Sequence, residues 1–206
     1  MRRSEFEVDA TDAQELFSAI EVGQLGFVDG DGWPMTLPVN FAFSGGKIFF
    51  HGAVDGAKYH ALKNGAKVTF LAYIPYSYIP SYWRSSEFAC PATMLFKSVL
   101  MKGWGDVITD AEEKALALGL LMAKYQPEGG HAPISAIAPL YAKELSNTAV
   151  FRVTPERVDV KQKFAQNLPL EVRNMLIEKL VARNKGMDVK TAEEIRLTTL
   201  EKPRGR

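Results

Sequence analysis

The sequence has a single cysteine, no long apolar run and almost no net charge. Cys90 is the only cysteine among 206 residues, which excludes an internal disulfide and a metal site built on several thiolates. No apolar run approaches the roughly 20 residues that a membrane-spanning helix needs. Arg2 and Arg3 are not followed by the apolar segment of a signal peptide. We therefore expect a soluble, cytoplasmic protein without a membrane anchor.

The charges are spread unevenly along the chain. The net charge is +1, and 47% of the residues are hydrophobic, which suits one globular domain with a sizeable core and a small appendage. Residues 161–206 hold 11 Lys/Arg against 6 Asp/Glu. We interpret this basic segment as solvated helix surface rather than a nucleic-acid site. The expected division is a domain over 1–160 and a helical extension over 161–206.

The first part of the chain reads as one helix followed by a meander. A capping box at Thr11 and Asp12 predicts a helix to about residue 22. Strands are then expected over 24–28, 35–43 and 47–51, separated by glycine-rich turns. Pro38 lies inside the second of these strands and has no N–H to donate, so we expect it at a bulge or a ligand-facing edge.

The remaining elements alternate less regularly. Their expected ranges are a helix over 59–63, a strand over 67–73, a long loop over 74–93, a strand over 94–107, a helix capped by Asp110, a strand over 148–160, and helices over 170–183 and 191–200. Mostly antiparallel strands with inserted helices predict an α+β fold, mainly β, of the barrel kind, with a C-terminal helical tail.

One strand-to-helix corner, FHGAVDGAKY over residues 50–59, carries the first functional signal. A phosphate needs backbone N–H groups that can approach closely and a nearby cation. Gly52, Gly56 and Lys58 meet this description, and a lysine in the first turn of a helix is unfavourable unless an anion lies there. The alternative is an ordinary solvated turn, because such residues also meet by chance. The spacing fits neither the nucleotide P-loop nor the dinucleotide fingerprint.

An ordered set of motifs then resembles a known family. The motifs are PVNFAF (38–43), FHGAVDGAK (50–58), ACPATMLFKSVLMKGWGDV (89–107) and DAEEKALAL (110–118). Together they resemble the FMN-binding split-barrel family, most of all the nitroimidazole-resistance (Nim-like) branch of the pyridoxamine 5'-phosphate oxidase-related proteins. The resemblance covers roughly residues 3–160, and KQKFAQNLP (161–169) is similar to a stretch that follows the barrel in some relatives.

The resemblance implies an antiparallel split β-barrel that forms a homodimer with FMN at the interface. Lys58 matches the lysine that holds the FMN phosphate, the 36–39 strand faces the edge of the ring, and residues 51–53 lie beside the ring and the ribityl chain. Polar positions of the long strand over 94–107 reach the cofactor, and residues after the barrel come from the partner chain. The implied cofactor-binding residues are Thr36, Leu37, Pro38, Val39, His51, Gly52, Ala53, Lys58, Lys97, Ser98, Lys163, Gln166 and Asn167. Relatives often carry a basic or large polar residue at the position of Ala57. The alanine of this chain removes a possible second hydrogen-bond donor to the phosphate.

The expected activity is a flavin-dependent reduction. A nicotinamide donor would supply electrons to a small acceptor, of which a nitroaromatic compound is one candidate. His51 is the expected catalytic residue, because an imidazole can orient the flavin or donate a proton; the alternative is a histidine bonded to backbone. The arginine-rich pattern of a true pyridoxamine-phosphate oxidase is missing from the sequence, so we do not assign that reaction.

Two other functions stay open. One is a haem-binding split barrel with His51 or His131 as the axial ligand. The other is a flavin-sensing regulator without catalysis. Three scattered histidines do not predict a metal site. Tyr82 and Trp83 are further pocket candidates, and Cys90 is interpreted as a small buried filler under the long loop rather than a redox thiol.

Overall fold

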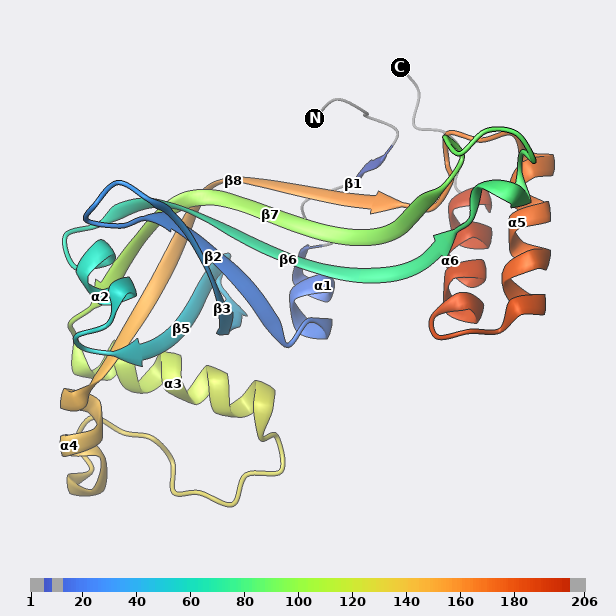
Figure 1. Cartoon of the computed structure of the whole chain (residues 1–206). Coiled ribbons are helices and arrows are strands. Elements are labelled where there is room, and N and C mark those ends of the chain that lie inside the picture. Colours follow the sequence, from blue (N-terminus) through green and yellow to red (C-terminus); the bar gives the residue numbers. More distant parts are fainter. Residues whose placement is uncertain (1–5, 9–12, 201–206) are drawn as a thin grey trace. The chain divides into compact units, whose positions relative to one another are not determined.

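The computed structural model describes residues 6–8 and 13–200 (Figure 1). They form a mainly β, α+β fold around one eight-stranded antiparallel sheet with the order β3-β2-β6-β7-β8-β5-β4, and β1 pairs with β8. The strands are β1 Glu7–Val8, β2 Val22–Val28, β3 Pro34–Asn40, β4 Ala42–Ser44, β5 Lys47–Ala53, β6 Ala66–Ile79, β7 Thr93–Ile108 and β8 Thr148–Lys163. The sheet does not close on itself, which agrees with the split barrel predicted from the sequence.

Six α-helices accompany these strands in the described part of the chain. They are α1 Ala13–Ala19, α2 Ala57–Leu62, α3 Ala111–Tyr125, α4 Pro139–Asn147, α5 Leu170–Arg183 and α6 Asp188–Leu200, and a short 3₁₀ helix spans Ser81–Trp83. None of these helices is long and apolar enough to cross a membrane. The capping box expected at Thr11 and Asp12 lies outside the described residues.

The chain divides into two compact units. The barrel unit consists of residues 10–72 and 99–159, and the extension unit consists of residues 1–9, 73–98 and 160–206. The boundaries between the units fall within β6, β7 and β8 or at their ends. Each unit has its own buried core.

Aromatic side chains fill much of the barrel unit's core. Phe41 contacts Phe17 and Phe70 edge-on, with ring centroids 5.6 Å and 4.9 Å apart. Helix α3 begins as predicted at Asp110, whose carboxylate accepts a hydrogen bond from the Glu113 N–H. Figure 1 shows α3 below β5, with α4 near the first turns of α3. Edge-to-face rings and a capped helix give this unit a rigid frame for the corner described below.

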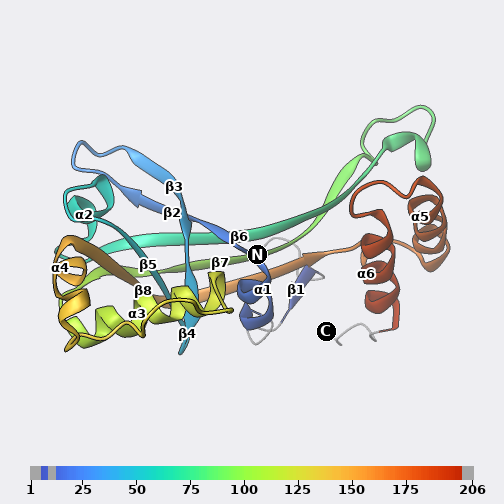
Figure 2. The ribbon, with the colours of Figure 1, turned by 90° about the horizontal axis from the view of Figure 1, so that it is seen from below.

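The extension unit is built around the antiparallel pair α5 and α6, which lie side by side in both views (Figures 1 and 2). Asn184 ends α5 in the left-handed conformation, with φ of 45°, and its N–H bonds to the carbonyl of Leu180. The fully buried Leu176 and Leu180 of α5 pack with Ile79 of β6 and Leu95 of β7. Burial of these apolar residues gives the extension a core of its own.

Several elements differ from the expected ones. The first helix ends at Ala19 rather than near residue 22, because β2 begins at Val22. The loop predicted over 74–93 is wrong in its first part, because β6 continues through Pro75 to Ile79. Tyr76 and Ser77 of this segment are buried against the helical pair, so tertiary packing stabilises a strand that its proline argues against. Helix α4 was not predicted. The strand expected over 35–43 is interrupted at residue 41, where β3 gives way to β4.

Candidate functional site

The corner between β5 and α2 is built much as the sequence predicts. Gly56 is the N-cap of α2, with extended backbone, and its carbonyl accepts hydrogen bonds from the N–H groups of Tyr59 and His60. The helix begins two residues earlier than expected and has only six residues. The dipole of so short a helix is small, so any attraction for an anion here comes mainly from Lys58.

Lys58 leans back from α2 over the end of β5. A Cβ built on Gly52 would lie 3.2 Å from Cε of Lys58 and 3.5 Å from its Nζ. A side chain at position 52 would therefore press against the stem of Lys58, while the ammonium group would remain at ordinary contact distance. Lys58 is half-buried.

His51 precedes this glycine on β5, in register with Val150 of β8. His51 is an exposed residue, although neighbouring atoms surround part of its imidazole. Its partial burial, and secondarily the positive charge of Lys58, lower the pKa of His51 below 6.5. At neutral pH the imidazole is therefore uncharged, with one N–H donor and one acceptor nitrogen, while Lys58 carries the positive charge of the corner.

Strand β3, which holds residues 36–39, lies at one end of the sheet path and pairs on one side with β2. Pro38 is opposite Gln24 in this pairing. The expectation that Pro38 lies on an edge is confirmed, because no further strand of the described chain pairs with the outer side of β3. Strand β3 also approaches β5. Strands β3 and β5, which hold the 36–39 segment and His51, are thus in contact within the barrel unit.

The other predicted cofactor residues belong to the extension unit. Lys97, on β7, forms an ion pair with Glu194 of α6, with Nζ 2.6 Å from Oε1, and both side chains are about 15% exposed (15% and 14%). The hydroxyl of Tyr76 donates to the same oxygen over 3.1 Å. Ser98 is half-buried on the same strand. Within one chain, the charge of Lys97 is therefore already matched by a carboxylate.

The segment after β8 forms a turn that the side chain of Gln166 stabilises. The Oε1 of Gln166 accepts from the N–H of Phe164 over 2.7 Å, and its Nε2 donates to the carbonyl of Gln162 over 2.8 Å. These bonds hold Ala165 at a φ of 62°, which is unusual for a residue with a Cβ. Gln166 thus has a structural role within its own chain.

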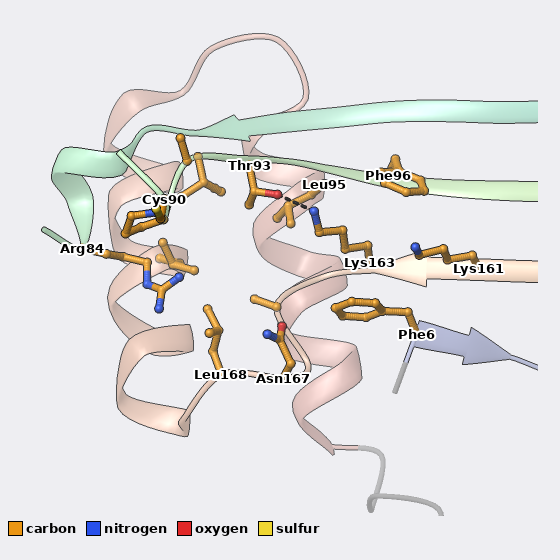
Figure 3. Close-up of a pocket in the computed structure, with 15 residues that line it drawn as sticks. Phe6, Arg84, Cys90, Thr93, Leu95, Phe96, Lys161, Lys163, Asn167 and Leu168 are labelled. Atoms are coloured by element: carbon orange, nitrogen blue, oxygen red, sulfur yellow. Dashed lines mark hydrogen bonds between the residues drawn. The ribbon is translucent and has the colours of Figure 1, made fainter. Parts of the chain in front are cut away.

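Lys163 and Asn167 line a cavity of about 460 Å³ within the extension unit (Figure 3). The ammonium of Lys163 donates to the hydroxyl of Thr93. Arg84 and Lys161 also line this cavity, and sequence reasoning singled out neither. Lys161 and Lys163 are two residues apart on one strand and therefore share a face. This spacing could have indicated that both cations line the same surface.

The remaining candidates are dispersed. His60 and His131 are exposed, and the described residues contain no cluster of His, Cys, Asp or Glu that could hold a metal ion. Cys90 is exposed and lines the cavity, so its interpretation as a buried filler was wrong; the long loop does not fold over it. Tyr82 is 73% exposed, and Trp83 packs beneath Arg183.

Solved structures share this fold at low sequence identity. An FAD and haem binding protein from Mycobacterium smegmatis is 21% identical, with a TM-score of 0.64, over 77% of this chain and 73% of that one. The flavocytochrome Anf3 from Azotobacter vinelandii is 21% identical, with a TM-score of 0.63, over 75% and 67%. A candidate 5-nitroimidazole antibiotic resistance protein from Bacteroides thetaiotaomicron is 20% identical, with a TM-score of 0.60, over 74% and 83%. No curated protein sequence shows significant similarity to this chain.

The open antiparallel sheet, its inserted helices and these structural neighbours place the protein in the split-barrel class. The family model for pyridoxamine 5'-phosphate oxidase matches residues 9–162. Because the match covers most of the chain, the protein belongs to the pyridoxamine 5'-phosphate oxidase family. Membership establishes the fold, and it does not by itself assign a reaction.

Proposed function

We propose that this protein is a flavoprotein that binds FMN at the corner between β5 and α2 and reduces a small acceptor. The observation that supports this proposal most strongly is the position of Lys58 against Gly52 at the end of β5. A lysine ammonium beside a glycine suits the doubly charged phosphate of FMN. The structural neighbours named for flavin binding support the same cofactor class.

The other predicted residues take roles around this phosphate site. The main chain of residues 36–39 lies on the edge strand β3 and faces the ring, which needs hydrogen-bonding groups that no neighbouring strand has used. Gly52 and Ala53 lie beside the ribityl chain. Lys97, Ser98, Lys163, Gln166 and Asn167 belong, in this proposal, to the surface that a second copy of the chain brings to the cofactor.

FMN supplies hydride and electron transfer when it is bound. The chain's part is to bind the phosphate, orient the ring and exclude water. His51 is the proposed catalytic residue: its lowered pKa keeps the imidazole neutral at pH 7, so that it holds one proton on a ring nitrogen and can donate a hydrogen bond to the acceptor or the ring. A reduced nicotinamide is the proposed donor, and a nitroaromatic compound is the proposed acceptor.

The test is a titration of the purified protein with FMN, followed by flavin absorbance and by fluorescence quenching. We expect saturable binding, weakened about tenfold to hundredfold by Lys58→Ala, because a charge-assisted hydrogen bond contributes about 1.5–3 kcal/mol. Lys63→Ala is the matched control, since Lys63 is an exposed lysine at the other end of α2. Equal affinity in both variants would overturn the proposed phosphate site.

A parallel titration with FAD and with haem separates the related cofactors. Preference for FMN supports the proposal. Uptake of haem with a Soret band that His51→Ala abolishes, without any binding of FMN, would replace it with the haem-binding function.

A further inference from the structure

The cavity of the extension unit is lined by apolar side chains and by cationic side chains. Phe96 and Leu168 are half-buried apolar lining residues, so they offer surface to a ligand. Ile79, Leu95 and Leu176 also line the cavity but are each only 1% exposed. They belong to the same buried cluster that joins the strands to the helical pair. The cavity volume of about 460 Å³ lies in the range of small-molecule sites. An apolar body of that size could bury its surface here.

The rim of the cavity is cationic. Arg84, Lys161 and Lys163 line it, and none of its described lining residues is acidic. Figure 3 shows the guanidinium of Arg84 on one side of the lining and the two lysines on the other. Glu7, the strand partner of Lys161 on β1, is not among the lining residues.

The two lysines share one aromatic neighbour. Their Nζ atoms lie 5.5 Å and 5.9 Å from the centroid of the same ring, that of Phe96, and Lys161 also lies 5.5 Å from the ring of Phe6. The aromatic faces attract both cations and keep them at the cavity. Two like charges on one ring repel each other, so an anion in the cavity would be stabilised by both.

Arg84 adds a second kind of anion-binding group. Its guanidinium has no hydrogen-bond or ion-pair partner among the described residues. A guanidinium matches a carboxylate with two parallel hydrogen bonds, and its fork is free to do so here.

We propose that this cavity binds an organic acid with an apolar body, the carboxylate contacting Arg84 or the Lys161 side of the rim and the body covering Phe96 and Leu168. This ligand is additional to the flavin proposed above. Lys163 and Asn167 are shared with the predicted flavin residues, so the test uses Arg84 and Lys161, which are not.

The experiment is calorimetric titration of the full chain with octanoate, with octanol as the uncharged ligand of the same chain length. We expect octanoate to bind with a weaker affinity at high salt, and octanol to bind much more weakly at all salt concentrations. Arg84→Gln and Lys161→Gln should each weaken octanoate binding about fivefold, as loss of a partly exposed ion pair implies. Lys190→Gln, an exposed lysine of the same unit that does not line the cavity, should bind octanoate as the unaltered chain does.

Three outcomes would overturn the proposal. Octanol binding as tightly as octanoate, or unchanged octanoate affinity in both variants with unchanged melting temperatures, would mean that the cavity does not recognise an acid. Displacement of octanoate by FMN, together with loss of FMN affinity in Arg84→Gln, would mean that the cavity is part of the flavin site. Failure of the flavin proposal is distinguishable, because Lys58→Ala affects only FMN binding if the cavity is a separate site.

Discussion

The guanidinium of Arg183 donates to both carboxylate oxygens of Asp188, with Nε 2.7 Å from Oδ2 and Nη2 2.7 Å from Oδ1. Asp188 is 1% exposed and also accepts from the hydroxyl of Ser77 over 2.6 Å and from the N–H of Lys185 over 2.9 Å. The same arginine donates to the carbonyl of Tyr78. One carboxylate thus joins the end of α5, the start of α6 and strand β6 within the extension unit.

Replacing this carboxylate should destabilise the extension unit. Asp188→Asn keeps the size of the side chain but removes the charge that pairs with Arg183, and we expect the free energy of unfolding to fall by about 2–4 kcal/mol. Urea denaturation measures this change. Asp159→Asn is the control, because Asp159 pairs with an arginine that is 59% exposed, and its loss should cost less than about 1 kcal/mol. Equal effects of the two variants would contradict the assigned role.

The same group predicts a stability change in acid. Hydrogen bonds from Arg183, before those from Ser77 and Lys185, lower the pKa of Asp188 from 3.8 to about 2. A folded-state pKa below the unfolded value stabilises the fold above about pH 4, and this contribution of about 2 kcal/mol disappears as the pH falls toward 2. The stability difference between the unaltered chain and Asp188→Asn should therefore be constant above pH 5 and shrink below pH 4. A difference that persists at pH 2 would exclude this cause.

The sequence predicts the bounds of a helix well where the residues at its two ends mark where it begins and stops. The bounds of α5 were predicted to the residue, because Pro169 precedes it and Asn184 can adopt the left-handed turn that ends it. Strand β6 was predicted too short, because Pro75 interrupts its pattern and only burial against the helical pair reveals the strand. Helix α4 carries too few buried residues to show an apolar stripe; only Leu145 is buried.

The candidate sites likewise differ in whether a local sequence pattern could predict them. Gly52 and Lys58 are six residues apart, so their sequence pattern could predict a shared corner, although not that the lysine leans over the glycine. The cavity residues Phe6, Arg84 and Lys161 come from distant segments that meet only through the pairing of β1 with β8 and the packing of the long loop. Such a site depends on tertiary structure, and no local pattern predicts it.

A side chain at position 52 should displace Lys58 without unfolding the protein. A Cβ on Gly52 would lie 3.2 Å from Cε of Lys58, a tight contact that a flexible lysine can relieve by moving. Gly52→Ala should therefore weaken FMN binding about fivefold or more while changing the melting temperature little. Gly30→Ala is the control, because no atom lies within 4 Å of the added Cβ. FMN titration and thermal unfolding of both variants measure the effect; a Gly52→Ala protein that binds FMN normally would contradict it.

Variants of the Lys97–Glu194 pair should separate a structural from a cofactor-binding role of Lys97. Either Lys97→Met or Glu194→Gln breaks a largely buried pair, and we expect Glu194→Gln, which leaves a buried ammonium without its partner, to reduce stability by about 3 kcal/mol. The effects on FMN affinity should differ: Lys97→Met lowers it, whereas Glu194→Gln releases the ammonium and does not. Urea denaturation and FMN titration give the two readouts. Equal FMN affinity in the two variants would remove Lys97 from the proposed cofactor contacts.

The charge of Lys58 should be detectable in the titration of His51 even without a cofactor. Partial burial and then the Lys58 charge lower the pKa of His51, so Lys58→Met should raise it toward 6.5, since removing a nearby positive charge favours the protonated imidazole. Proton NMR of the imidazole signals against pH measures the shift, with the His51 signal assigned by its loss in His51→Gln. Lys63→Met is the control and should leave the titration unchanged. An unshifted His51 in Lys58→Met would mean that the lysine does not lie near the imidazole in solution.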